Sequence, residues 1–136
     1  MIPTTVLMMI DGLDPEYLES CPAPNLEQLS RDGFRVEAKA IMPTVTNVNN
    51  VSLVTASYPE EHGITSNYLL NRGLGQQEFS EVYMESCEFI QKETMFQRST
   101  SQGARSLLVT AKDKLRRLLG HKLENGICFS AEKADQ

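Results

Sequence analysis

The chain has 136 residues, of which 40% are hydrophobic and 23% are charged, so it can build one ordinary core and is not disordered by composition. Its net charge of −5 and its pI near 5.0 exclude the basic surface that binds nucleic acid or an anionic membrane. No apolar run approaches the roughly 20 residues that cross a bilayer, and Met1–Ile10 lacks the features of a signal peptide, so we expect a soluble, cytoplasmic protein.

The first predicted elements are a strand and a helix. Val6–Ile10 is a short apolar run that ends at Asp11, which is typical of a strand buried on both faces of a parallel sheet. Asp14 is followed by a proline, and this order predicts a helix N-terminus. We expect that helix to end near Ser20.

A second helix and a second strand are expected before residue 42. Asn25–Asp32 carries leucines at helical spacing and precedes a glycine that can end a helix. Phe34–Ile41 alternates as a strand does. Further on, Val51–Thr55 is rich in β-branched residues but continues a helical spacing of valines, and we interpret it as helix.

The remainder is predicted to be a loop followed by alternating helices and strands. Ser57–Ser80 has little periodicity and contains a hairpin signal around Asn71–Gly73. The later elements are helix Thr94–Gln102, strand Arg105–Thr110, helix Ala111–Leu119 and strand Gly126–Ser130. This alternation of strand and helix along the chain predicts an α/β fold with a mainly parallel sheet.

The stretch Met42–Asn50, MPTVTNVNN, allows two interpretations of its threonines, Thr44 and Thr46. One is a loop with a helix cap, because Thr and Asn side chains bond free backbone N–H groups. The other is a nucleophile, because a hydroxyl at a helix N-terminus lies where negative charge is favoured. Taken alone, the stretch favours the loop.

Polar residues follow three of the predicted strands. They are Asp11, the Thr44 and Thr46 pair, and the segment Thr110–Lys114. Ligands of open α/β sheets bind beyond the carboxyl ends of the strands, so these groups are expected on one rim. Asp11 can be a hard oxygen ligand for a metal, but taken alone it favours a turn that caps the next helix.

Three segments resemble the alkaline phosphatase superfamily in its nucleotide pyrophosphatase/phosphodiesterase branch. They are Val6–Leu18, Met42–Asn50 and Tyr58–Asn67, in family order. The resemblance implies an alkaline-phosphatase-like three-layer αβα fold, incomplete here, in which residues 1–136 form the amino-terminal part of one catalytic domain.

Within that branch, three further stretches resemble the phosphonoacetate hydrolases. They are Asn47–Asn50, Val109–Leu115 and Gly126–Asp135. This resemblance implies hydrolysis of the carbon–phosphorus bond of phosphonoacetate to acetate and phosphate. A small-molecule phosphonate is then the expected partner, and a homodimer is compatible with the complete enzyme.

The resemblance also implies site residues and a cofactor. Asp11 aligns with a metal-ligating aspartate, and Thr46 aligns with a nucleophile that also ligates zinc. Asn67 aligns with a residue that donates a hydrogen bond to a phosphoryl or phosphonyl oxygen. Lys112 and Lys114 are expected near the substrate carboxylate. Two Zn²⁺ ions are expected in the complete enzyme, because coordination to a dication can ionise a threonine hydroxyl.

Other features limit this interpretation. His62 is excluded from the metal site, because its position in the family is structural, and Ala56 stands where relatives often carry glycine. Relatives draw most of their aspartate and histidine zinc ligands from the later part of a longer chain. This sequence has only two histidines, His62 and His121. We therefore expect an amino-terminal fragment that is inactive alone. A nucleotide pyrophosphatase/phosphodiesterase and a non-catalytic α/β fragment stay as alternatives.

Overall fold

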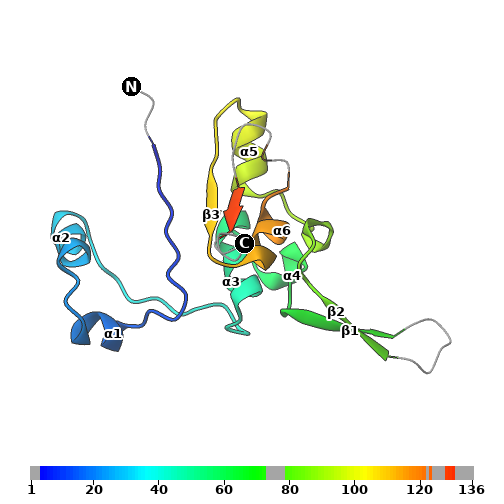
Figure 1. The fold of residues 1–136 in the computed structure, drawn as a ribbon, viewed down its shortest axis with the longest axis horizontal. Helices are drawn as coiled ribbons and strands as arrows, with labels where there is room; N and C mark the ends of the chain where they lie inside the picture. Colours follow the sequence, from blue (N-terminus) through cyan, green and yellow to red (C-terminus); the bar gives the residue numbers. More distant parts are fainter. Residues whose placement is uncertain (1–3, 73–78, 122, 124–127, 131–136) are drawn as a thin grey trace. The chain divides into compact units, whose positions relative to one another are not determined.

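The structure is a computed structural model, and it describes residues 4–72, 79–121, 123 and 128–130 (Figure 1). The chain divides into two compact units, Met1–Ala40 and Ile41–Gln136. No helix in the described ranges is long and apolar enough to cross a membrane.

The first unit contains two helices, α1 at Pro15–Ser20 and α2 at Pro24–Asp32. The Asp14 carboxylate caps α1 by accepting a hydrogen bond of 2.8 Å from the backbone N–H of Tyr17. Both helices begin with a proline at the first position, where the missing N–H costs nothing. Both predicted helices are therefore confirmed.

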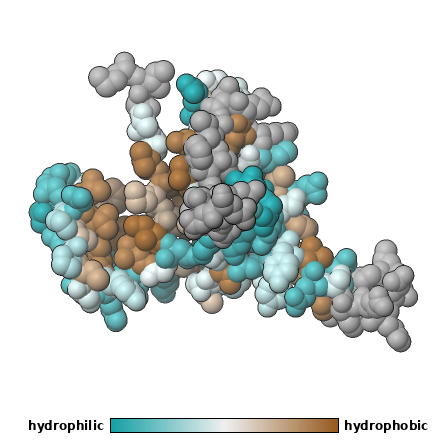
Figure 2. Space-filling model, in the orientation of Figure 1, coloured by the Kyte–Doolittle hydropathy of each residue, from teal (hydrophilic) through white to brown (hydrophobic). Residues whose placement is uncertain are grey.

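The two strands predicted in the first unit are wrong. Val6–Ile10 and Phe34–Ile41 have no strand assignment, and their large apolar side chains before Ile41 are exposed, with Phe34 at 83% and Val6 at 77%. A strand is defined by backbone hydrogen bonds to a neighbour, and the described residues give neither segment such a neighbour. Apolar composition alone was therefore not sufficient to make these segments strands. Hydrophobic residues, drawn in brown, are visible on the molecular surface (Figure 2).

The second unit is built around helix α3, Thr46–Thr55, whose buried face is apolar. Val48 and Val51 are fully buried, and Ile64 and Leu118 pack into the same core with no exposed surface. This confirms helix rather than strand for the valine-rich segment. Tertiary packing stabilises α3 here, since β-branched residues are weak helix formers.

Four other helical elements surround this core. They are α4 at Pro59–His62, the 3₁₀-helix η1 at Cys87–Phe89, α5 at Met95–Ser101 and α6 at Asp113–Leu119. Helices α5 and α6 confirm the predicted positions to within two residues. The predicted loop was wrong for α4, which starts at a proline and ends at Gly63 in the left-handed region, φ +82°.

A hairpin and a parallel strand pair complete the second unit. Strand β1, Tyr68–Arg72, pairs antiparallel with β2, Phe79–Tyr83. A hairpin is therefore confirmed, but its predicted place around Asn71–Gly73 is wrong for Asn71 and Arg72, which belong to β1; residues 73–78 lie outside the described residues. Strand β3, Leu108–Thr110, pairs parallel with β4, Cys128–Ser130. The α/β class is therefore correct, whereas the larger parallel sheet and the three layers stay predictions.

Candidate active site

Thr46 is the first residue of α3, at the positive end of a ten-residue helix. The preceding residue, Val45, has an extended backbone and no side chain that can cap the helix, and the first turn contains no acidic residue. The free N–H groups of a helix N-terminus attract anions. The start of α3 is thus compatible with a negatively charged group beside the Thr46 hydroxyl.

Asn67 supplies the cap that Val45 cannot. Its Oδ1 accepts a hydrogen bond of 3.1 Å from the backbone N–H of Asn47, twenty residues earlier. Its backbone carbonyl accepts a second bond of 2.9 Å from the N–H of Met84. With Oδ1 bound in this way, the Nδ2 group of Asn67 makes no hydrogen bond to any described residue and can donate to a ligand.

The side chain of Lys112, which lies 66 positions later in the chain, contacts the hydroxyl of Thr46. Its Nζ lies 3.4 Å from Oγ1 of Thr46, and the backbone of Lys112 forms the N-cap of α6. The hydroxyl of Thr110 accepts a hydrogen bond of 3.2 Å from the N–H of Lys112, which fixes the turn between β3 and α6. An ammonium group at this position favours the ionised form of the hydroxyl.

The other cations of α6 have different surroundings. Arg116 donates to Asp113 at 2.7 Å, and Arg117 pairs with both Asp113 and Glu85. Such pairs between neighbouring turns are typical of a solvated helix face. Lys114 is half-buried and makes no hydrogen bond or ion pair with a described residue. Lys114 thus differs from Arg116 and Arg117, which are ion-paired.

The asparagines of the MPTVTNVNN stretch each bond the protein backbone, as the loop interpretation of the stretch expects, but their particular partners were not predicted from the sequence. Asn47 donates from Nδ2 to the carbonyl of Met84 at 2.7 Å. Asn49 pairs with both backbone groups of Ile41, accepting at 3.0 Å and donating at 3.1 Å. Asn50 donates to the first carbonyl of its own helix at 2.9 Å. The run of three asparagines was the only signal of this network in the sequence.

Both ring nitrogens of His62 make hydrogen bonds within the second unit. The ring is fully buried, and its Nδ1 accepts a hydrogen bond of 3.1 Å from the N–H of Ile64. Nε2 must then carry the proton of the neutral ring, and it lies 2.9 Å from the hydroxyl of Ser52, to which it can donate. Burial lowers the pKa of His62 from its usual value near 6.5.

Asp11 and Thr44 are exposed, and Asp11 belongs to the first unit. Its assignment as a metal ligand stays a prediction. Within the described ranges, no three side chains of the His, Cys, Asp and Glu types come together in a way that could hold a metal ion. The described residues by themselves therefore do not supply a complete zinc site.

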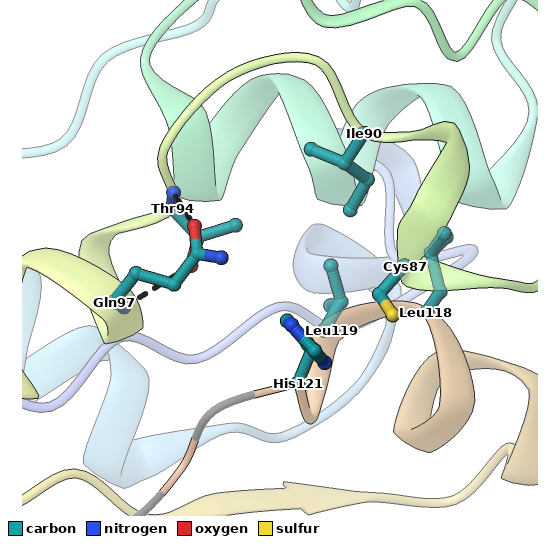
Figure 3. A pocket seen from close by; sticks show the side chains of 7 residues that line it. All are labelled: Cys87, Ile90, Thr94, Gln97, Leu118, Leu119 and His121. Atoms are coloured by element: carbon teal, nitrogen blue, oxygen red, sulfur yellow. Dashed lines mark hydrogen bonds between the residues drawn. The ribbon is translucent and has the colours of Figure 1, made fainter.

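A small cavity of about 20 Å³, room for about one water molecule, lies elsewhere in the second unit (Figure 3). It is lined by Cys87, Ile90, Thr94, Gln97, Leu118, Leu119 and His121. Thr94 and Gln97 close the start of α5 there by a reciprocal capping box, with bonds of 2.8 and 3.3 Å. None of the predicted site residues lines this cavity.

The model of the type I phosphodiesterase / nucleotide pyrophosphatase family matches residues 5–112. Among curated proteins, the chain is 41% identical over 66 residues to a bis(5'-adenosyl)-triphosphatase of Xenopus laevis, which covers 48% of this chain and 15% of the relative. It is 33% identical over 95 residues to an ectonucleotide pyrophosphatase/phosphodiesterase of Caenorhabditis elegans, covering 69% of this chain and 13% of the relative.

Among solved structures, the chain resembles the phosphonoacetate hydrolase of Sinorhizobium meliloti 1021. The TM-score is 0.79 at 38% identity for the complex with phosphonoacetate, and the match covers 92% of this chain and 31% of that protein. For the complex with phosphonoformate the TM-score is 0.72 at 41% identity, covering 82% and 27%. The chain therefore spans less than a third of the length of these relatives.

Proposed function

The chain belongs to the type I phosphodiesterase / nucleotide pyrophosphatase family, and we propose that in full-length form it hydrolyses the carbon–phosphorus bond of phosphonoacetate. The products are acetate and phosphate. The observation that carries this proposal is the position of Thr46 at the start of α3, with Lys112 at 3.4 Å and the Asn67 side chain anchored on the adjacent N–H group. The likeness to a solved phosphonoacetate hydrolase supports it.

The proposed nucleophile is the hydroxyl of Thr46. Loss of its proton to solvent allows Oγ1 to attack phosphorus, so that an oxygen–phosphorus bond forms and the phosphorus–carbon bond breaks. The electron pair of the broken bond stays on the acetate carbon, which takes a proton from water. A water molecule then cleaves the phosphothreonine, which releases phosphate and restores Thr46.

Positive charge in the site has two assigned sources within the second unit. The N-terminus of α3 and the ammonium of Lys112 both favour negative charge on the phosphonyl oxygens and on Oγ1. The Nδ2 group of Asn67 donates to a phosphonyl oxygen. Lys114, which has no ion pair with a described residue, is assigned to the substrate carboxylate.

Two zinc ions are also proposed for the full-length protein, with Asp11 and Thr46 each contributing one oxygen. The described residues do not hold a complete ligand set, so no step of the reaction is derived through a metal. A cytoplasmic location and a homodimer likewise stay proposals. The larger parallel sheet in three layers is proposed by analogy with the solved relative.

A nucleotide pyrophosphatase/phosphodiesterase is the second candidate, because the curated relatives carry such names. It would use the same threonine and Lys112, but its substrate has no carboxylate for Lys114 to bind. A non-catalytic α/β fragment is the third candidate for the isolated chain.

One experiment tests the main proposal. This chain would replace the matching segment of the Sinorhizobium meliloti phosphonoacetate hydrolase, and the chimera would be mixed with phosphonoacetate and quenched in acid. We expect release of phosphate and acetate, with phosphothreonine at position 46 detectable by mass spectrometry. A folded chimera that cleaves an aryl phosphodiester but not phosphonoacetate would favour the second candidate.

A further inference from the structure

Asn47, directly after the proposed nucleophile, is buried in a way that costs stability. Its side chain has no exposed surface, and Nδ2 donates to the carbonyl of Met84 at 2.7 Å. Its Oδ1 is buried as well and has no hydrogen-bond partner among the described residues. A buried polar atom without a partner is unfavourable. Such exceptions to the rules of a stable core occur mainly at functional sites.

The bonds of Asn47 close a ring with two other residues. The backbone N–H of Asn47 donates to Oδ1 of Asn67 at 3.1 Å, and the N–H of Met84 donates to the carbonyl of Asn67 at 2.9 Å. The Asn47 side chain completes the ring at the carbonyl of Met84. Three hydrogen bonds therefore join the first turn of α3, Asn67 directly before β1, and Met84 directly after β2.

We propose that Asn47 is a positioning residue that holds Asn67 against the nucleophile. This inference rests on the proposed function. Asn47 touches no substrate atom, but it joins the segment after β2 to the helix that begins with Thr46. With Oδ1 of Asn67 fixed on the helix, the Nδ2 group of the same amide is oriented for a phosphonyl oxygen. Without the Asn47 side chain, the carbonyl of Met84 loses its donor, and the segment whose N–H bonds Asn67 is no longer tied to α3.

The test of the geometry uses the 136-residue chain labelled with ¹⁵N. The variant Asn47→Leu keeps the approximate shape of the side chain and removes the donor to Met84. We expect hydrogen exchange of the backbone amide at position 47 to become about tenfold faster, because its acceptor on Asn67 is no longer held. We also expect the side-chain amide signals of Asn67 to shift.

Asn50→Leu is the matched control, because it also removes one side-chain bond to a backbone carbonyl, here that of Thr46, but lies outside the ring. It should leave the amide at position 47 protected. Unchanged protection in Asn47→Leu, or an equal change in the control, would overturn the proposal. If Asn47→Leu does not fold, the reciprocal variant Asn67→Ala decides, because opening the ring should speed exchange of the Asn47 side-chain amide.

Kinetics of the chimera distinguish a positioning role of Asn47 from a general role in packing. If Asn47 acts through Asn67, then Asn47→Leu lowers kcat/KM for phosphonoacetate in an otherwise unchanged chimera. It should cause no further loss where Asn67 is already alanine. Additive losses would overturn the proposal. If the chimera lacks all activity, the proposed function fails, whereas the exchange data still decide the role of Asn47.

Discussion

The ammonium of Lys112 lies 3.4 Å from the hydroxyl of Thr46, although 66 positions separate the two residues in the chain. One comes from the turn after β3 and the other from the start of α3. A cation beside a hydroxyl at a helix N-terminus favours the alkoxide. This pair makes Thr46, rather than Thr44, the residue on which the proposed chemistry depends.

Replacement of Thr46 by alanine should abolish turnover of phosphonoacetate by the chimera, with a loss of about 10³-fold or more, because no other oxygen replaces the nucleophile. The fold should persist, since the change removes a hydroxyl rather than core volume. Phosphate release and circular dichroism measure the two effects. Thr44→Ala, at an exposed position, is the control, and similar losses in both variants would contradict the assignment.

The two lysines should differ in their effect on substrate choice. Lys114→Ala should lower kcat/KM for phosphonoacetate by about 10–100-fold, the range of one charge-assisted hydrogen bond, and leave an aryl phosphodiester nearly unaffected. Lys112→Ala should lower kcat/KM for both substrates, because its ammonium faces Thr46. Lys92→Ala, an exposed lysine paired with Glu61, is the control. Equal losses on both substrates for Lys114→Ala would favour the phosphodiesterase function over hydrolysis of phosphonoacetate.

Asn67 has one acceptor for the helix and one donor for the ligand, and two variants separate them. Asn67→Asp keeps the oxygen that accepts from Asn47 and adds negative charge at a helix N-terminus, so stability should hold or rise by about 0.3–1 kcal/mol. Asn67→Ala removes the cap and should cost about 0.5–2 kcal/mol.

Both Asn67 variants should nevertheless lower kcat/KM for phosphonoacetate, because both lack the Nδ2 donor. Urea unfolding of the chain and kinetics of the chimera provide the comparison. If activity simply followed stability across the two variants, Asn67 would have only a structural role.

His62 should make the stability of the chain depend on pH. Burial lowers its pKa in the folded state below the usual value near 6.5, so the unfolded state binds the proton more readily. The contribution of the neutral ring is complete above pH 6.5 and is lost as the pH falls through the lowered pKa. Urea midpoints between about pH 7.5 and about pH 5 should therefore decrease. His62→Gln should remove this part of the decrease, whereas His121→Gln, at an exposed position, should keep it.

Ala56 ends α3 in the left-handed region, with φ +50°. An L-residue pays roughly 1–2 kcal/mol there, whereas glycine pays about 0.5–1 kcal/mol of extra backbone entropy, so Ala56→Gly should stabilise by about 0.5–1 kcal/mol. Gly63→Ala is the opposite case, because φ is +82° and a Cβ would lie 2.9 Å from the carbonyl oxygen of Phe89. Chemical denaturation compares the two, and a loss of stability in Ala56→Gly would refute the strain argument.

Elements whose signals are local can be predicted from the sequence. Helix α1 follows from Asp14, which bonds an N–H three residues later, and α5 follows from the reciprocal bonds of Thr94 and Gln97. Such caps lie within one turn of the helix, so a short window of sequence contains both partners. The candidate residues Thr46, Asn67 and Lys112 were also named from sequence, through family resemblance.

Which segments pair, and which of the candidate residues meet, depends on contacts between distant parts of the chain. Phe34–Ile41 has the alternation of a strand but no strand neighbour among the described residues, since a ladder depends on a partner that may lie anywhere in the chain. The ring of Asn47, Asn67 and Met84 likewise joins residues 20 and 37 positions apart. Hydrogen bonds over such separations form only after α3 and the hairpin have packed, because side-chain chemistry alone does not specify a distant partner.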